Sequence, residues 1–293
     1  MQQDKIKIGL IQTSVSEDKD LNLTRTLDKA REAISKGAKI ICLQELYRTI
    51  YFPQWQEKDV SALAEKIPGE STDAFSALAK EYQVVIIVPL FERDEDVFHN
   101  SVVVIDANGK LLSTYRKVHI PQDPLFYEKS YFQPGREIKV YETRYARFAV
   151  LICYDQWFPE AARIAVLGGA DIIFYPTAIG WINDLEQEEG DWHEAWETIQ
   201  RSHAIANGVQ VAAVNRVGEE GKLIFWGSSF VCDAFGEIIA KASDKEEEVL
   251  VAELDLSQNE LVREEWGFLR NRRPDIYEFL IKPVSRKEGA ALQ

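Results

Sequence analysis

One cysteine in this sequence stands where a strand would give way to a helix. Cys153 follows the apolar run FAVLI and precedes YDQWFPE, in which Pro159 suits the first turn of a helix. Near a helix N-terminus, the macrodipole and free backbone N–H groups stabilise a thiolate, and the same N–H groups can receive an oxyanion. Cys153 is therefore a candidate nucleophile, with a buried core cysteine as the equally good alternative on position alone.

Three charged residues could assist this cysteine. Glu45 follows the apolar run KIICLQ, and a carboxylate at the end of a buried strand is poorly solvated, which suits a general base. Lys117 ends the segment LLSTYRK, and its ammonium could stabilise an oxyanion or the thiolate. Glu128 lies in the aromatic segment FYEKSYF, where it needs a partner, and Lys117 is the natural one. When each of these residues is considered alone, an ordinary solvent-exposed position accounts for its presence equally well.

Acids and tryptophans are concentrated in GWINDLEQEEGDWHEAWE, residues 180–197. The acids that could hold a substrate ammonium are Glu186, Glu188, Glu189 and Asp191, of which we select Glu186 and Asp191. Trp181 or Trp192 could add a cation–π wall. For any single one of these acids, a solvated loop is the better interpretation. As a group, they favour a substrate with a cationic or neutral chain.

The residues after the nucleophile support the same preference. Tyr154 and Trp157 are candidate substrate-binding residues because both belong to the short stretch after Cys153. This stretch includes no arginine that could bind a carboxylate through a bidentate hydrogen-bonded pair. A carbamoyl amino acid, which carries a carboxylate, would be expected to need such an arginine.

These candidates need a scaffold, and apolar runs rich in Val and Ile predict its strands. The predicted strands are residues 5–11, 39–43, 83–88, 101–105, 148–152, 171–175, 209–214 and 228–232. Amphipathic patterns predict helices at residues 22–36, 73–82, 159–167 and 191–206. Strands and helices in alternation indicate an α/β protein.

The chain also repeats itself in order. The matching pairs are GAKII (37–41) with GADII (169–173), YQVVIIV (82–88) with GVQVAAV (208–214), and SVVVIDANGK (101–110) with SSFVCDAFGE (228–237). Chance similarity among apolar strands is the alternative to a true repeat. The D-A-x-G pieces predict hairpin turns and hence antiparallel pairing there. We predict one domain of two pseudo-two-fold-related halves, with stacked sheets and outer helices: an αββα sandwich.

Composition excludes several classes of function. The 293 residues carry a net charge of −14, which argues against nucleic acids and anionic membranes as partners. The N-terminus does not resemble a signal peptide, no run of about 18 apolar residues occurs, and the three cysteines form no CxxC, so we expect a cytoplasmic protein with no membrane span. Neither GxGxxG nor a metal-ligand spacing such as HExxH is present, and no metal or organic cofactor is expected.

Together the motifs resemble the nitrilase (C–N hydrolase) superfamily over nearly the whole chain. The segments that carry the resemblance are LQEL, YRKVHIP, FYEKSYFQPG, ICYDQWFPEAAR, FYPTAIG, NRVG and RNRRPDIY. One departure is Gln44, where that superfamily often has proline before the glutamate. The resemblance implies an αββα fold with Glu45 as base, Lys117 as electrophile, Cys153 as nucleophile and Glu128 as an additional acid.

Within that superfamily, CYDQWFPEAAR and FYPTAIG resemble the N-carbamoylputrescine amidohydrolases of polyamine biosynthesis. Those enzymes more usually read CWDQWFPE, so Tyr154 is a small departure beside the nucleophile. The resemblance implies hydrolysis of N-carbamoylputrescine to putrescine, carbon dioxide and ammonia through a cysteine thioester. The alternatives are an ω-amidase, an aliphatic amidase, another carbamoyl or nitrile-cleaving enzyme, or a non-catalytic binding module.

The C-terminal region is expected to differ from the rest. We predict a single hydrolase domain at residues 1–260 and an arm at 261–293, which has few apolar runs. In the superfamily such tails cross to a partner subunit, so the resemblance implies a homo-oligomer, a dimer or larger.

Overall fold

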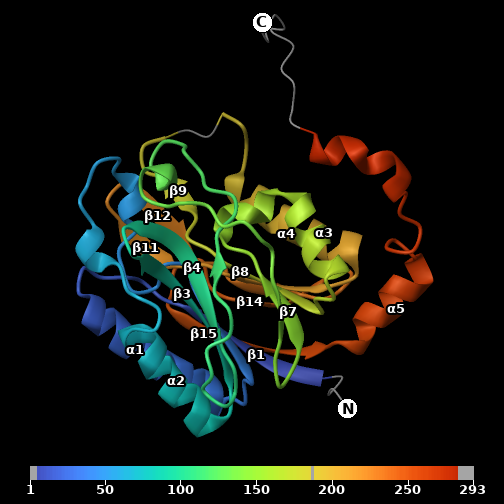
Figure 1. Ribbon diagram of the computed structural model, residues 1–293, viewed down its shortest axis with the longest axis horizontal. Coiled ribbons are helices and arrows are strands. Elements are labelled where there is room, and N and C mark those ends of the chain that lie inside the picture. The colour runs from blue at the N-terminus through green and yellow to red at the C-terminus, as the bar shows by residue number, and fades with distance from the viewer. Residues whose placement is uncertain (1–4, 186–187, 283–293) are drawn as a thin grey trace, which may run out of the picture.

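The protein, seen in a computed structural model, is described over residues 5–185 and 188–282. Two six-stranded sheets lie face to face, with helices outside them (Figure 1). The first sheet has the order β15 (Glu248–Asp255), β1 (Lys5–Gln12), β2 (Ile40–Leu43), β3 (Val85–Asp94), β4 (Val97–Ile105) and β5 (Tyr115–Arg116). The second has the order β14 (Ile238–Lys241), β13 (Phe230–Cys232), β10 (Gln210–Val214), β8 (Ile172–Pro176), β7 (Arg147–Val150) and β6 (Val140–Glu142).

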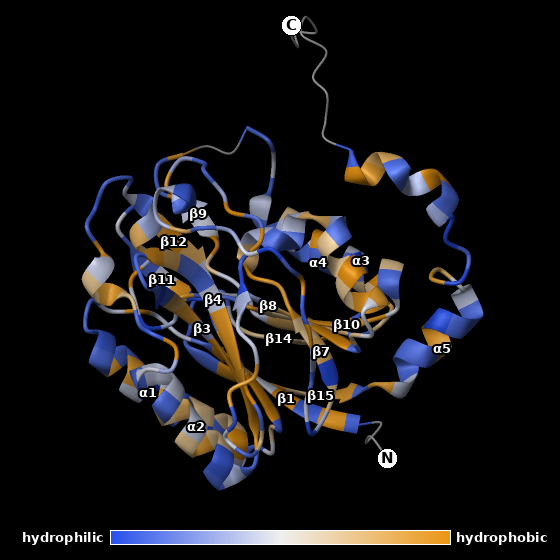
Figure 2. Cartoon of the chain, viewed as in Figure 1, coloured by the Kyte–Doolittle hydropathy of each residue, from blue (hydrophilic) through white to orange (hydrophobic). Residues whose placement is uncertain are grey.

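The helices complete four layers. Helices α1 (Lys19–Ser35) and α2 (Glu70–Tyr82) cover the first sheet, and α3 (Pro159–Leu167) and α4 (Trp192–Asn207) cover the second. The main core lies between the sheets, where the strands are most hydrophobic (Figure 2). Phe148 and Phe174 pack edge to face there, with ring centroids 5.2 Å apart. The predicted αββα sandwich is therefore confirmed.

The two halves have the same topology, as the sequence repeats predicted. In the first half β1, β2 and β3 run parallel and β4 is antiparallel to β3. In the second half β7, β8 and β10 run parallel and β13 is antiparallel to β10. Both D-A-x-G turns close antiparallel hairpins, and Gly109 and Gly236 both have φ +80°. A left-handed conformation at the same place in each half explains why glycine recurs there.

The eight predicted strands and four predicted helices are all present, with boundaries moved by a few residues. Helix α1 begins three residues earlier than predicted because Asp18 caps it, accepting from the N–H groups of Asp20 and Leu21. Strand β15 was not predicted from the sequence, although it pairs antiparallel with β1 along its whole length. A small third sheet of β11 (Val217–Glu220), β12 (Leu223–Trp226) and β9 (Gly180–Ile182) was not predicted either.

Helix α5 (Ser257–Trp266) begins the C-terminal region and straddles the domain boundary proposed at residue 260. It docks on the second half, where Asn259 donates to the Asp171 carbonyl at 2.7 Å. The following 3₁₀ helix η5 (Pro274–Ile281) has no buried residue and extends along the side of the molecule (Figure 1). Within the described ranges, no helix combines the length and apolarity needed to cross a membrane.

Candidate active site

A fully buried lysine lies between two fully buried carboxylates. The Lys117 Nζ is 2.9 Å from Oε1 of Glu45, and 2.8 and 2.7 Å from the two carboxylate oxygens of Glu128. All three side chains have no solvent exposure. The predicted partnership of Lys117 and Glu128 is thus present, and Glu45 joins it from a position 72 residues away in the chain.

The strands of the first sheet position this cluster. Glu45 follows β2 by two residues, Lys117 follows β5 directly, and Glu128 begins the 3₁₀ helix η3 (Glu128–Ser130). Asn100 on β4 donates to Oε1 of Glu45 at 2.7 Å and accepts from the backbone N–H of Lys117 at 2.8 Å. Tyr51 donates its hydroxyl to Glu128 at 2.8 Å. Buried charges are tolerated here because most of their donors and acceptors are paired.

Cys153 begins a 3₁₀ helix, η4 (Cys153–Trp157), which leads into α3. Its φ of +42° is unusual for a residue other than glycine and turns the chain sharply at the end of the strand. The thiol is 7% exposed, and its Sγ lies 3.9 Å from the carbonyl of Ala178. A strained turn of this kind exposes a nucleophile above a sheet edge, as in the nucleophile elbows of other hydrolases.

The surroundings of Cys153 oppose the thiolate form, against the stabilising effect that a position near a helix N-terminus was expected to have. Burial raises the pKa of Cys153 well above its ordinary value, and the charge of Glu45 raises it further. Lys117 lowers the pKa of the thiol, but less than these two effects raise it. A base must therefore remove the proton when the cysteine reacts. The Oε2 of Glu45 is buried with no hydrogen-bond partner among the described residues, so it is available for that task.

Lys117 remains an ammonium in this setting. Burial alone would lower its pKa, but the carboxylates of Glu128 and Glu45 raise it above the ordinary value. Burial raises the pKa of Glu128 to about 6, against the lowering effect of Lys117. A permanent cation beside Cys153, held by carboxylates, is suited to stabilising a developing oxyanion.

Asp155 joins the strand of Lys117 to the turn of Cys153. Its buried carboxylate accepts from the backbone N–H of Ile152 at 2.8 Å and the hydroxyl of Tyr115 at 2.6 Å. It also accepts from the backbone N–H of His119 at 2.9 Å and lies 2.7 Å from that residue's Nδ1. The sequence analysis assigned it no role, although it lies within the motif that follows the nucleophile.

A cavity of about 440 Å³ opens above Cys153 and Glu128. Its walls are largely apolar, with Asp123 and Glu189 among them. Among the described residues that line it, none is a lysine, arginine or histidine. Trp192 donates its indole N–H to the Glu189 carboxylate at 3.4 Å and stacks on Trp181, so an acid and an aromatic surface adjoin in this wall. Such a cavity suits an apolar chain that ends in a cation.

The structure places the four predicted substrate-binding residues differently. Tyr154 and Trp157 both line the cavity. Asp191 is instead the N-cap of α4, accepting from the Glu194 N–H at 3.0 Å, and it does not line the cavity. Glu186 lies outside the described residues. Glu189, from the same acidic segment, is the acid that reaches the cavity.

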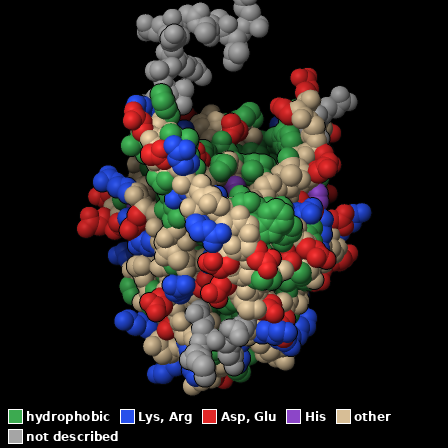
Figure 3. Space-filling model, turned by 90° about the vertical axis from the view of Figure 1, so that its right-hand side faces the viewer, with side chains coloured by type: hydrophobic (Ala, Val, Ile, Leu, Met, Phe, Trp, Pro, Cys, Tyr) green, Lys and Arg blue, Asp and Glu red, His purple; other side chains and the backbone are tan. Residues whose placement is uncertain are grey.

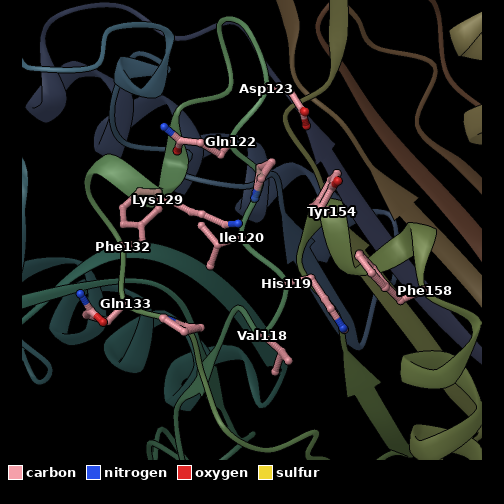
Figure 4. Close-up of a pocket in the computed structure, with 12 residues that line it drawn as sticks. Val118, His119, Ile120, Gln122, Asp123, Lys129, Phe132, Gln133, Tyr154 and Phe158 are labelled. Atoms are coloured by element: carbon pink, nitrogen blue, oxygen red, sulfur yellow. The ribbon is translucent and has the colours of Figure 1, made fainter. Parts of the chain in front are cut away.

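A second, larger groove of about 760 Å³ adjoins the first and shares Pro121, Asp123 and Tyr154 with it. The close-up shows Asp123 and Tyr154 on facing segments at the junction, with His119 lying beside Phe158 (Figure 4). The His119 and Phe158 rings stack with centroids 3.7 Å apart. The groove and the cavity therefore meet beside the loop that follows Lys117.

In the part of the chain that the structure describes, no group of three or more His, Cys, Asp and Glu side chains is arranged to bind an ion.

Several residues of the site escaped the sequence analysis. Tyr51, Asn100 and Asp123 carry no periodic or spacing signal, because their roles depend on neighbours distant in sequence. Asn215 and Arg216 had a signal in the NRVG segment, which was quoted only for its resemblance.

Comparisons with known proteins agree over most of the chain. The family model described as Carbon-nitrogen hydrolase matches residues 7–264. An N-carbamoylputrescine amidase from Arabidopsis thaliana is 43% identical over 288 residues, which cover 94% of this chain and 95% of that protein. A citrullinase from Francisella tularensis is 37% identical, covering 94% of this chain and 98% of that protein.

Solved structures share the fold. The crystal structure of a carbon-nitrogen hydrolase from Helicobacter pylori G27 superposes with a TM-score of 0.90 at 43% identity, covering 96% of this chain and 99% of that one.

Proposed function

Because this chain belongs to the carbon-nitrogen hydrolase family of the nitrilase superfamily, we propose that it hydrolyses N-carbamoylputrescine to putrescine, carbon dioxide and ammonia. The observation that carries the proposal is the cavity above Cys153. Cys153 and Glu128 line this cavity, the ammonium of Lys117 is paired with Glu128 and with Glu45, and the described lining carries acids but no cation.

The proposed reaction starts with proton transfer from Cys153 to Glu45. The thiolate attacks the ureido carbon, forming a C–S bond and moving the carbonyl electron pair onto oxygen. The ammonium of Lys117 and the backbone N–H of Tyr154, at the start of η4, stabilise this oxyanion. When the oxyanion collapses, the C–N bond breaks and the leaving nitrogen takes the proton held by Glu45.

A carbamoyl thioester on Cys153 remains. Glu45 takes a proton from water, whose oxygen attacks the thioester carbon, and the C–S bond breaks with return of the proton to sulfur. The carbamic acid released splits into carbon dioxide and the second nitrogen product. Dividing one difficult hydrolysis into two steps is the benefit of covalent catalysis.

Charge complementarity favours this substrate over amino-acid analogues. Citrulline, N-carbamoyl-β-alanine and ω-amides of dicarboxylic acids all carry a carboxylate at the far end, which calls for a cation in the wall. The described wall instead offers Glu189 beside Trp192, together with Asp123, to the amine of putrescine. We therefore propose Glu189 as the first partner of the distal ammonium, with Tyr154 and Trp157 along the methylene chain. Glu186, chosen from the sequence, stays a secondary candidate outside the described residues, whereas Asp191 caps α4 and is not proposed for this role.

The test measures ammonia release from N-carbamoylputrescine, with citrulline, N-carbamoyl-β-alanine and an ω-amide in parallel. We expect turnover of the putrescine derivative and its loss in Cys153→Ala. Glu189→Gln should raise KM for that substrate about tenfold while kcat changes little, because it removes binding energy remote from the reacting carbon. If only the ω-amide were turned over, the proposed substrate would be wrong, whereas the assignment to the carbon-nitrogen hydrolase family would still hold.

Lys117→Met provides the test of the oxyanion role. Loss of one oxyanion donor typically costs about 10²–10³ in rate, and we expect at least that decrease in kcat. The variant must be shown to be folded, since removing one partner of a buried ion pair also destabilises a protein. A folded Lys117→Met protein with near-native kcat would exclude the assignment.

A further inference from the structure

Two consecutive residues, Asn215 and Arg216, contact opposite walls of the active site. They lie between β10 and β11 in the second half of the chain, and both are fully buried. The Arg216 side chain reaches the loop that carries Glu45 in the first half. The Asn215 side chain reaches the segment beside Cys153.

Arg216 holds the backbone of the proposed base. Its Nη2 donates to the carbonyl oxygens of Glu45 at 2.8 Å and Leu46 at 3.0 Å. Its Nη1 donates to the carbonyl of Thr49 at 3.3 Å. Leu46 has a φ of +47°, a conformation that costs a leucine free energy unless its surroundings enforce it. The guanidinium thus fixes a strained turn directly after Glu45.

The same guanidinium also reaches Glu128 through a short chain of contacts. Arg216 pairs with Glu220 at 2.7 Å, and the other oxygen of Glu220 accepts from the backbone N–H of Tyr51 at 2.5 Å. Tyr51 in turn donates to Glu128. The guanidinium lies 5.2 Å from the Phe225 ring centroid, which restricts it further. Both carboxylates that flank Lys117 therefore depend on one buried arginine.

Asn215 holds the other wall. Its side-chain amide accepts from the Ile179 N–H at 3.1 Å and donates to the Ile179 carbonyl at 2.9 Å, as a strand partner would. Ile179 lines the cavity, and the carbonyl of its neighbour Ala178 faces the Cys153 thiol. A third hydrogen bond, to the Gly227 carbonyl at 3.1 Å, anchors the amide.

We infer that Asn215 and Arg216 form a positioning clamp that sets Glu45 against Cys153. Neither is a catalytic residue, since each acts through the backbone of another segment. The two segments arise from different halves of the molecule, and this dipeptide contacts both of them. The inference rests on the proposed roles of Glu45 and Cys153 and is independent of which amide or ureido compound is the substrate.

The experiment compares Arg216→Lys with Arg48→Lys. Arg48 serves as the control because it is also buried, at 4% exposure, and lies in the loop that carries Glu45, but it pairs with Glu65 and Glu70 instead of the Glu45 carbonyl. Lysine keeps the charge at position 216 but cannot span Glu45, Leu46 and Glu220 at once. Misplacement by about 1 Å can cost about 10² in rate, so we expect kcat of Arg216→Lys to fall about 10²-fold with KM within about threefold.

Alkylation by iodoacetamide at pH 7 supplies a readout without substrate. Only Cys153 opens onto the cavity, so unmodified Cys42 and Cys232 identify the folded molecules. In those molecules we expect Cys153 to react at least about tenfold more slowly in Arg216→Lys, because Glu45 no longer reaches its proton. Arg48→Lys should match the native rate. Asn215→Asp, which cannot donate to the Ile179 carbonyl, should lower both kcat and the alkylation rate.

The measured kcat and alkylation rates distinguish a positioning role of Arg216 from a contribution to folding stability alone. A lower melting temperature for Arg216→Lys with native kcat and native alkylation in folded molecules would overturn the inference, as would equal losses in Arg48→Lys. If Arg216→Lys does not fold, Glu220→Gln replaces it, which removes the ion pair but keeps an acceptor for Tyr51. We then expect about a tenfold loss of kcat. If no substrate is turned over, the proposed function fails while the alkylation comparison still decides the clamp.

Discussion

The site combines a lysine and a cysteine whose pKa values are both raised, for different reasons. Burial by itself favours the neutral form of both side chains, because it lowers the pKa of a lysine and raises the pKa of a cysteine. The pKa of Lys117 rises because two carboxylates surround it, whereas the pKa of Cys153 rises because burial and Glu45 both oppose a thiolate. Reactivity therefore depends on a proton transfer within the site and not on a standing thiolate.

The pH dependence of alkylation tests this at the level of single residues. In Glu45→Gln, we expect iodoacetamide to modify Cys153 about 10²-fold more slowly at pH 7 than in the native protein. Since burial raises the pKa of the thiol above its ordinary value, the variant should recover only in alkaline solution, beyond the pH at which a free cysteine ionises. Peptide mass spectrometry gives both rates. Equal rates at pH 7 would show that Glu45 is not the base.

At the level of elements, the site is assembled by segments that lock the ends of strands together. Asp155 ties the segment around Lys117 to the turn around Cys153, and four groups approach its one carboxylate. The turn of Cys153 has a left-handed backbone, so it requires such support from its neighbours.

Asp155→Asn should weaken this connection. An amide has one acceptor atom in place of two, so donors that Asp155 now satisfies would be left buried and unpaired. We expect a loss of about 3 kcal/mol in the free energy of unfolding, measured with urea, and a lower kcat. Asp94→Asn is the control, because that carboxylate is half-exposed in its pair with Arg116, and it should cost less than about 1 kcal/mol. Similar losses in both variants would contradict this view of Asp155.

At the scale of the whole molecule, the exposed apolar side chains of the C-terminal region bear on whether the protein forms an oligomer. Beyond α5, the chain exposes large apolar side chains: Ile276 at 61%, Phe279 at 79%, Leu280 at 64% and Ile281 at 87%. On the face that forms the right-hand side of Figure 1, hydrophobic side chains also gather around a hollow near the top of the molecule (Figure 3). Such exposure is costly in water unless it is covered. We propose, as the superfamily resemblance implies, that this arm packs on a second copy of the chain.

Charges placed on the arm should disrupt that assembly. For Phe279→Glu combined with Ile281→Glu, we expect a smaller molar mass in light scattering and an unchanged far-UV circular dichroism spectrum. Glu278→Gln, on the same turn, should keep the native mass. A native protein that is already monomeric at micromolar concentration would refute the proposal.

What the sequence determined by itself was local or repeated. The apolar runs predicted eight of the strands, the 3.6-residue patterns predicted four of the helices, and the repeats predicted two halves, because each depends on neighbours in the chain. The resemblance brought Glu45, Lys117, Glu128 and Cys153 to one site, and the structure shows the first three in direct contact.

The tertiary structure alone decided what crosses between distant segments. Strand β15 escaped prediction although it forms eight pairs with β1, and Asp191 turned out to be a helix cap while Glu189 reaches the cavity. The raised pKa of the Cys153 thiol and the hydrogen bond from Arg216 to the Glu45 carbonyl are also visible only in the tertiary structure. Each of these depends on burial or on a hydrogen bond between residues far apart in sequence, and neither quantity is a property of any single stretch of chain.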